Sequence, residues 1–320
     1  MWSRSKSLRV SSAFSLFVAM LLTASSPGVA DASACCIGST SSQAGRLGRC
    51  EALAVGVGLS TEGVVGSWTS RGDFSLVRNH RDITHRLIGL FALRPTRKLQ
   101  FGLSIPLVLQ ARSIDALTEV GGGPGDLNMW VRFEPFEDTL KILPVPSFSL
   151  LITAPTGIPL DKAKGSLGTG ATGTGHWAFG GAVAFEQTIV RGGLEFGAEA
   201  RASTPRRVDG HRRSPGVAWQ GYGSGSYFLR PDVTLSWSGG VRGLTPGWIE
   251  GRSAGTNSIE PFIGFTGAFK VGGTDRLTIG LRSSLPIPKL GLSDQATVSI
   301  SMTYTHIKQE LPRIKRKAET

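Results

Sequence analysis

Charged residues are scarce in this chain: they make up 18% of its 320 residues, against about a quarter in an average soluble domain. Beyond the N-terminal region, no apolar run approaches the ~18 residues of a transmembrane helix. Glycine, by contrast, is plentiful, with 43 residues. Little charge, much glycine and the missing apolar runs together predict β-structure with one apolar face.

Sequence signatures of enzymes are also missing. There is no G-x-S-x-G nucleophile elbow, and the Gly-rich segment 165–175 lacks the Gly-Lys-Ser/Thr that ends a phosphate loop. Of the five histidines, His176 comes closest to a catalytic residue, because it begins a strand beside that segment. No His or acidic residue stands at metal-ligand spacing from the cysteines. We therefore expect no catalytic residues, no cofactor and no metal, with a barrel hydrolase using His176 as the least favoured alternative.

The N-terminus has the form of an export signal. Arg4, Lys6 and Arg9 precede an apolar stretch, 10–24, of signal-peptide length. Cleavage after Ala34 predicts a signal peptide over residues 1–34. Cleavage after Ala30 and an uncleaved anchor helix are the alternatives.

The three cysteines, Cys35, Cys36 and Cys50, all lie in the following segment, 35–50. Export would bring them into an oxidising compartment, so a disulfide from Cys50 to either Cys35 or Cys36 is plausible and leaves one thiol over. Cleavage after Ala34 would make Cys35 the first residue, which raises lipidation as an option. A lipobox normally has a large aliphatic residue where this chain has Ala32.

The formal net charge is +12, and basic residues cluster at 206–213 and in the tail, 308–320. No nucleic-acid-binding motif surrounds either cluster, so no nucleic-acid partner is expected. Anionic lipid headgroups or an anionic solute suit an exported protein better.

The dominant signal in the rest of the chain is alternation of apolar and polar residues, the pattern of a strand with one apolar face. It is clearest at 97–110, 126–133 and 294–307, where residues such as Leu103, Met129 and Ile300 share one face. Weaker versions occur at nine further places: 53–59, 83–93, 148–154, 177–185, 194–200, 217–228, 233–241, 259–269 and 277–285. About twelve strands of membrane-crossing length predict a closed antiparallel transmembrane β-barrel over residues 51–307. A soluble β-sandwich or periplasmic barrel is the alternative.

Connections between these strands alternate in length. Short turns are expected at 94–97, 188–192, 229–232 and 271–275, and long loops at 62–81, 113–124, 156–174, 205–216 and 245–258. Outer-membrane barrels combine short periplasmic turns with longer external loops. The segment 134–146 is an exception, a long turn on the periplasmic side.

Charged residues on the face opposite the apolar one should line the barrel interior, because a Lys or Arg facing lipid at mid-depth costs about 2–4 kcal/mol. The candidates for the lumen are Asp126, Arg132, Glu195, Glu199, Arg201, Arg242 and Arg282. The Gly-rich external loop could fold inward and narrow a pore, which makes Gly168, Thr169, Gly170 and His176 candidates for a constriction.

Three short motifs follow one another in the middle of the chain: Gly123-Pro124-Gly125-Asp126 before a strand, Pro155-Thr156-Gly157 after the next, and Leu167-Gly168-Thr169-Gly170 in the loop. Their order resembles the outer-membrane channel family named for the meta pathway of phenol degradation. The resemblance covers residues 120–190 well and the remainder only by pattern. It implies a barrel and a solute that is hydrophobic or aromatic.

These observations predict an outer-membrane channel or transporter for small solutes. A structural or adhesive barrel with a plugged lumen is the alternative. The expected partners are outer-membrane lipid, a small-molecule solute and the barrel-assembly machinery.

Overall fold

The computed structural model describes residues 47–48, 51–68, 74–76, 80–136, 143–255, 257–285 and 295–309. The expected signal peptide, the three cysteines and the basic tail beyond Gln309 lie outside these ranges. None of the described residues belongs to a helix long and apolar enough to cross a bilayer.

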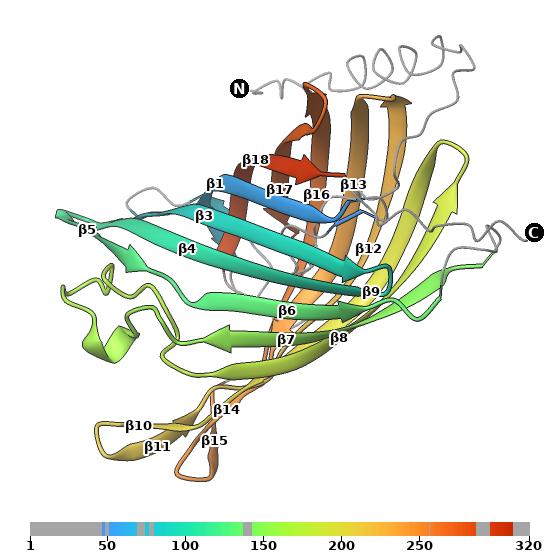
Figure 1. Cartoon of the computed structure of the whole chain (residues 1–320). Helices are drawn as coiled ribbons and strands as arrows, with labels where there is room; N and C mark the ends of the chain where they lie inside the picture. Colours follow the sequence, from blue (N-terminus) through green and yellow to red (C-terminus); the bar gives the residue numbers. More distant parts are fainter. Residues whose placement is uncertain are drawn as a thin grey trace, which may run out of the picture. The chain divides into compact units, whose positions relative to one another are not determined.

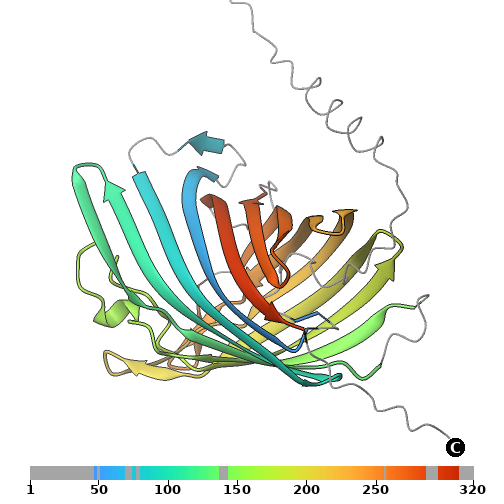
Figure 2. The same cartoon turned by 45° about the horizontal axis from the view of Figure 1, so that its top comes forward.

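The described residues form a closed antiparallel barrel of twelve strands, as the alternation predicts (Figure 1). Its strands, in chain order, are β1 (Leu53–Trp68), β3 (His80–Thr96), β4 (Leu99–Ile114), β5 (Leu117–Pro124) with β6 (Leu127–Phe133), β7 (Val145–Ala154), β8 (Ala178–Ile189), β9 (Gly192–Ser203), β12 (Ala218–Arg230), β13 (Val233–Leu244), β16 (Ser258–Val271), β17 (Asp275–Ser284) and β18 (Gln295–Lys308). Each strand pairs with its neighbour in the chain, and β18 pairs with β1 from Leu53↔Lys308 to Ser67↔Gln295. Figure 2 shows β1, in blue, between β18 and β3.

β5 and β6 together make one barrel strand, interrupted at Gly125 and Asp126. Both parts pair with β4. Pro124 has no amide hydrogen to continue the ladder, and the Gly125 N–H donates to the Pro106 carbonyl at 2.7 Å. The interruption coincides with the first of the three motifs found in the sequence.

The two ends of the barrel differ in their connections. At one end, here called the short-turn end, tight turns join β3 to β4, β8 to β9, β12 to β13 and β16 to β17, and the barrel's first and last paired residues, Leu53 and Lys308, also lie there. The opposite end, the long-loop end, carries the segment 155–177 with a short 3-10 helix, η2 (Leu160–Lys162). This division agrees with the expected alternation of short and long connections.

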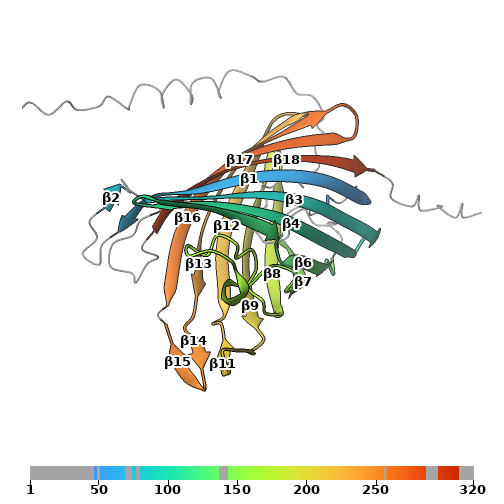
Figure 3. The ribbon, with the colours of Figure 1, turned by 90° about the vertical axis from the view of Figure 1, so that its left-hand side faces the viewer.

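Several of the segments expected to be loops contain strands. The segment 113–124 is a tight hairpin, because Asp115 adopts the left-handed backbone that a two-residue turn needs (φ 53°). β2 (Phe74–Leu76) pairs with the end of β1. A separate four-stranded sheet projects at the long-loop end (Figure 3) and consists of β10 (Arg206–Val208), β11 (His211–Ser214), β14 (Gly247–Ile249) and β15 (Arg252–Ala254).

The barrel turns its apolar residues outward. Phe196, Phe265 and Ile300 are 55–59% exposed although they are among the most apolar side chains of their strands. The same holds around the barrel for Val57, Leu107, Leu150, Phe179, Trp237 and Leu281. A soluble protein rarely exposes so large a continuous apolar surface, whereas the outside of a membrane barrel requires one. The soluble alternatives are therefore disfavoured.

Candidate functional site in the barrel lumen

Residues of the opposite parity face the interior, and many are glycine, serine or threonine. On β18 they are Thr297, Ser299, Ser301, Thr303 and Thr305, which alternate with the exposed Ile300, Met302 and Tyr304. Charged side chains of the interior gather in two places, one at each end of the barrel.

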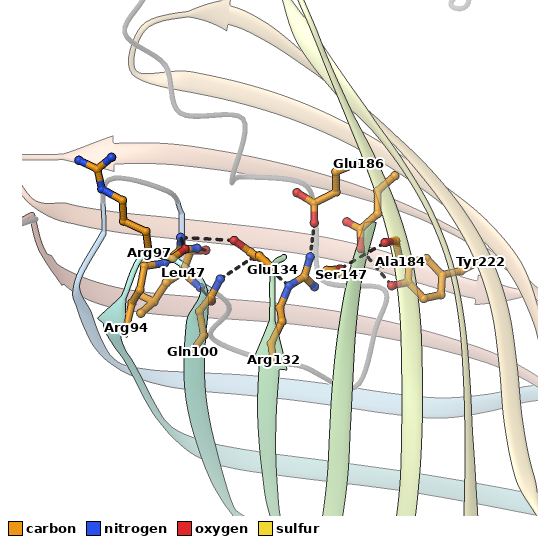
Figure 4. A network of polar contacts seen from close by, with 11 residues as sticks. Leu47, Arg94, Arg97, Gln100, Arg132, Glu134, Ser147, Ala184, Glu186 and Tyr222 are labelled. Carbon is orange, nitrogen blue, oxygen red and sulfur yellow. Dashed lines mark hydrogen bonds and ion pairs between the residues drawn. The ribbon is translucent and has the colours of Figure 1, made fainter. Parts of the chain in front are cut away.

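The first place is a network at the short-turn end, centred on Arg132 of β6 (Figure 4). Its side chain is 1% exposed and forms ion pairs with Glu134, at 3.0 Å, and with Glu186 of β8. Gln100 donates to the same Glu134 carboxylate at 2.8 Å, and Arg94 lies 3.4 Å from it. Two guanidiniums and an amide thus converge on one carboxylate, which offsets much of the cost of burying these charges.

The chain ahead of the first strand takes part in this network. The Leu47 N–H donates to Gln100 Oε1 at 3.2 Å, and Arg94 donates to the Leu47 carbonyl at 3.1 Å. The Leu47 side chain is 1% exposed and packs in a cluster with Ala54, Ala92, Trp130, Leu151 and Ile307, which come from five different strands. This residue therefore lies inside the short-turn end of the barrel.

A second contact fixes the same segment. Glu51 is 2% exposed, and its carboxylate pairs with Arg276 of β17 at 2.5 Å and accepts the Gly48 N–H at 2.6 Å. Farther round the wall, Tyr222 of β12 donates to Glu195 of β9 at 3.0 Å. Polar contacts at this end therefore reach from β3 to β12 and, through Glu51, to β17.

The second place is a pocket of about 420 Å³ on the interior wall at the long-loop end. Its lining includes three of the charged residues expected in the lumen, Glu199, Arg201 and Arg242, together with Glu260 of β16. Arg242 and Glu260 form a bidentate pair at 2.6 and 2.8 Å. Ala218 and Leu244 supply apolar surface to the same pocket.

Arg282 of β17 lies on the same part of the wall. Its guanidinium stacks on the Phe262 ring at 3.8 Å, and Phe262 is 1% exposed. Further round, two ion pairs join neighbouring strands, Arg86 with Glu62 and Arg112 with Asp82, both at 3.0 Å. These pairs leave the groups more exposed than those around Arg132, at 23–38% of their side-chain surface.

The segment 155–177 packs against the inner face of the β4–β5 hairpin. Glu119 of β5 accepts the Leu167 N–H at 2.8 Å and the Thr169 hydroxyl at 2.7 Å, and Arg112 donates to the Leu167 carbonyl at 2.8 Å. The Glu119 carboxyl has a lowered pKa, mainly because the Leu167 N–H stabilises its charged form. Thr169 is 1% exposed, so this part of the loop is firmly packed.

Asp126 holds the other end of the loop. Its carboxylate accepts the N–H groups of Gly157, at 3.0 Å, and Thr174, at 2.7 Å. Thr156 donates to the Gly125 carbonyl at 2.6 Å. The fold thus brings the first two motifs of the sequence together, and the Glu119 contacts bring the third beside them.

Of the residues expected in the constriction, Thr169 and Gly170 meet Gly121 of β5 at very close range: a Cβ at Gly121 would lie 2.6 Å from the backbone of both. Gly168 has a positive φ of 66°. His176 is 8% exposed, and its Nδ1 lies 2.6 Å from the Thr204 carbonyl. Among the described residues, His176 forms hydrogen bonds with this carbonyl and with Thr174, and with no serine. A group of three metal-binding side chains is likewise lacking among the described residues.

Sequence reasoning missed part of the network at the short-turn end. The residues that the lumen prediction does not include are Leu47, Arg94, Gln100, Glu134 and Glu186. Gln100 could have been found, because it has the parity of an inward residue on a strong alternating strand. Leu47 could not, since it precedes the first strand and no periodicity reaches it. The missed Glu260 of the pocket also has inward parity on its strand.

No family model and no curated protein matches the sequence. Among solved structures, an outer-membrane channel from Pseudomonas putida F1 is similar with a TM-score of 0.64 and 14% identity, over 89% of this chain and all of that one. More distant similarities include the translocator domain of the autotransporter NalP from Neisseria meningitidis (TM-score 0.45, 10% identity, 80% and 88% covered). Another is a mutant of the monoaromatic hydrocarbon channel TodX (TM-score 0.43, 11% identity, 82% and 91% covered). The similarity to the Pseudomonas putida F1 protein shows that the chain has the fold of an outer-membrane β-barrel channel, as the resemblance of its three motifs implies.

Proposed function

We propose that the barrel is a passive outer-membrane channel for small solutes with an apolar body. The observation that carries this proposal is the pocket at the long-loop end, about 420 Å³ in volume, with apolar surface and a few charged groups. Its volume is typical of a small-molecule site. Its position on the interior wall favours a solute that enters the lumen over one that binds the outside.

A barrel with a plugged lumen is the second candidate, and the network at the short-turn end favours it. Arg132, Glu134 and Gln100 fill part of that end with paired charges, and the buried Leu47 lies among them. A hydrolase is the third candidate, and it requires His176 to act as a base although its ring is held by a backbone carbonyl.

Conductance distinguishes the first two candidates. The refolded chain, lacking residues 1–34, is inserted into planar bilayers, and single-channel current is recorded over a range of voltage and pH. A passive channel gives stepwise current, and vesicles that carry it swell in solutions of small solutes. A barrel that inserts and shows heat-modifiable gel mobility, but never conducts, would refute the channel and support the plugged barrel.

The hydrolase has its own test. Lipid and peptide hydrolysis is measured for the wild type and for His176→Ala, and activity that disappears in the variant would replace the channel by an enzyme. Fractionation of cells into inner and outer membranes tests the location independently.

A further inference from the structure

We propose that Arg201 is a binding residue for a carboxylate, so that the pocket at the long-loop end takes a small amphipathic acid. The inference deepens the proposed function and rests on it, because it names the chemical class of the solute. The two arginines of the pocket, Arg201 and Arg242, have different surroundings.

Arg201 is held in place by neutral groups. Its Nη1 lies 3.1 Å from Thr153 Oγ1 and 3.3 Å from Asn128 Oδ1, and Thr153 in turn donates to Asn128 at 2.8 Å. Within the described ranges, no carboxylate forms an ion pair with Arg201, although Glu199 lies two residues away on the same face of β9. These contacts engage Nη1, and Nε and Nη2 form no hydrogen bond with the described residues, so both remain able to donate to a ligand.

Arg242, the other arginine of the pocket, differs in having its charge matched. Glu260 accepts from both Nε and Nη2 of Arg242, at 2.8 and 2.6 Å. This fork-to-carboxylate pair is the geometry in which arginine binds a carboxylate most strongly. A solute would have to displace Glu260 to use Arg242, whereas Arg201 needs no displacement.

Arg282 is a weaker candidate for the same role. Its guanidinium covers the Phe262 ring, and its Nη2 is buried and without a hydrogen-bond partner among the described residues. A buried donor cannot reach a solute unless the side chain moves. Of the three, Arg201 alone lines the pocket without forming an ion pair among the described residues, although the Glu199 carboxylate offsets part of its charge from a distance.

The rest of the pocket selects the body of the ligand. Ala218 and Leu244 provide apolar contact, and the volume of about 420 Å³ accommodates a molecule of the size of a substituted benzene ring. A guanidinium has a planar pair of donors that matches a carboxylate. An apolar body with one carboxylate fulfils both requirements, and an aromatic or short-chain carboxylic acid is the simplest such solute.

Benzoate binding to the refolded barrel in detergent tests this assignment without requiring conductance. Isothermal titration is performed with benzoate, with benzyl alcohol of the same shape but no charge, and with acetate, which lacks the apolar body. The variants are Arg201→Gln and Arg201→Lys. Arg230→Gln, at the short-turn end, removes the same charge away from the pocket and serves as the control.

The proposal expects benzoate to bind more tightly than benzyl alcohol and acetate. Arg201→Gln should weaken benzoate binding about tenfold or more, as expected when a charged hydrogen bond is removed. Arg201→Lys should weaken it less, and Arg230→Gln should leave it unchanged.

Two results would overturn the assignment: wild-type protein that binds benzoate no better than benzyl alcohol, or Arg201→Gln that binds benzoate as the wild type does. The first comparison needs no variant and therefore holds even if Arg201→Gln fails to fold. A barrel that conducts but does not prefer benzoate would refute this inference and leave the channel standing. A barrel that binds benzoate through Arg201 but never conducts would refute the channel and leave the site standing.

Discussion

The two ends of this barrel use the same residue types for different purposes. At the short-turn end, Arg132 is 1% exposed and is neutralised by two carboxylates. At the long-loop end, Arg201 lines a pocket and contacts only neutral acceptors. Buried charge that is fully paired fixes structure, whereas a charged group that forms no ion pair beside a pocket is available to a ligand. Inward parity alone therefore does not identify a functional charge.

The largest expected effect is at the centre of the paired network. Arg132→Ala leaves Glu134 and Glu186 without their shared cation in a buried place, which costs about 3–5 kcal/mol. Urea-induced unfolding in lipid vesicles, followed by tryptophan fluorescence, measures the change. Arg86→Ala is the control, because its pair with Glu62 is 29–38% exposed and is worth about 1 kcal/mol or less. Equal losses of unfolding free energy in Arg132→Ala and Arg86→Ala would show that the buried network at the short-turn end contributes no more to stability than an exposed ion pair.

A smaller effect is expected where the chain ahead of β1 enters the barrel. Leu47→Ala removes most of a side chain that is 1% exposed. The cost should be about 2–3 kcal/mol, at the low end for a core leucine because the segment can relax. If this segment helps to close the short-turn end, the variant should also conduct more than the wild type. Leu107→Ala is the control, since its side chain is 52% exposed on the outer surface.

Bilayer recordings of the two leucine variants, beside their unfolding curves, give both readouts. Unchanged stability and conductance in Leu47→Ala would show that the segment neither anchors nor closes this end.

The sequence predicts features that depend on neighbouring residues of one strand, but not contacts between residues that are far apart in the chain. Strand number, the turn at each short connection and the inward parity of Arg132, Arg201 and Arg242 follow from alternation within single strands. The hairpin at 113–124 is missed because Val120 is the one large aliphatic residue on the outward face of its short, Gly-rich second strand, which therefore resembles a loop. The contacts of Leu47 and of Asp126 join residues 31 to 53 positions apart, and no local pattern predicts them.

The third-largest effect on stability is expected at the contact between the segment 155–177 and the β4–β5 hairpin. Gly121→Ala would place a Cβ 2.6 Å from the backbone of Thr169 and Gly170, and overpacking of this kind costs about 1–3 kcal/mol. The loop should separate from β5, so trypsin should cut faster at Lys162 and Lys164. Gly63→Ala serves as the control, because nothing lies within 4 Å of a Cβ there. Equal cleavage of the variant and the wild type would mean that the loop does not depend on this close approach.

The smallest effect concerns the carboxylate that binds the same loop from the hairpin. Glu119 accepts the Leu167 N–H, and this contact lowers the pKa of the Glu119 carboxyl below its ordinary value of 4.5. A lowered pKa in the folded state means that the stabilisation is complete above the ordinary value and is lost as the pH falls through the lowered one. Hydrogen exchange at the Leu167 amide, corrected for its intrinsic pH dependence, should therefore be slow at neutral pH and faster in acid. Glu119→Gln should exchange faster than the wild type at neutral pH and should lack the acid transition.

Glu250→Gln provides the matched control, because Glu250 accepts a backbone N–H from Arg212 in the separate four-stranded sheet. Its substitution should leave exchange at Leu167 unchanged at every pH. If the acid transition persists in Glu119→Gln, another group holds the loop, and the long-loop end owes its order to the Asp126 contacts instead. In that case the two ends would resemble each other more, because each would be held by charged groups whose hydrogen bonds and ion pairs are satisfied within the barrel.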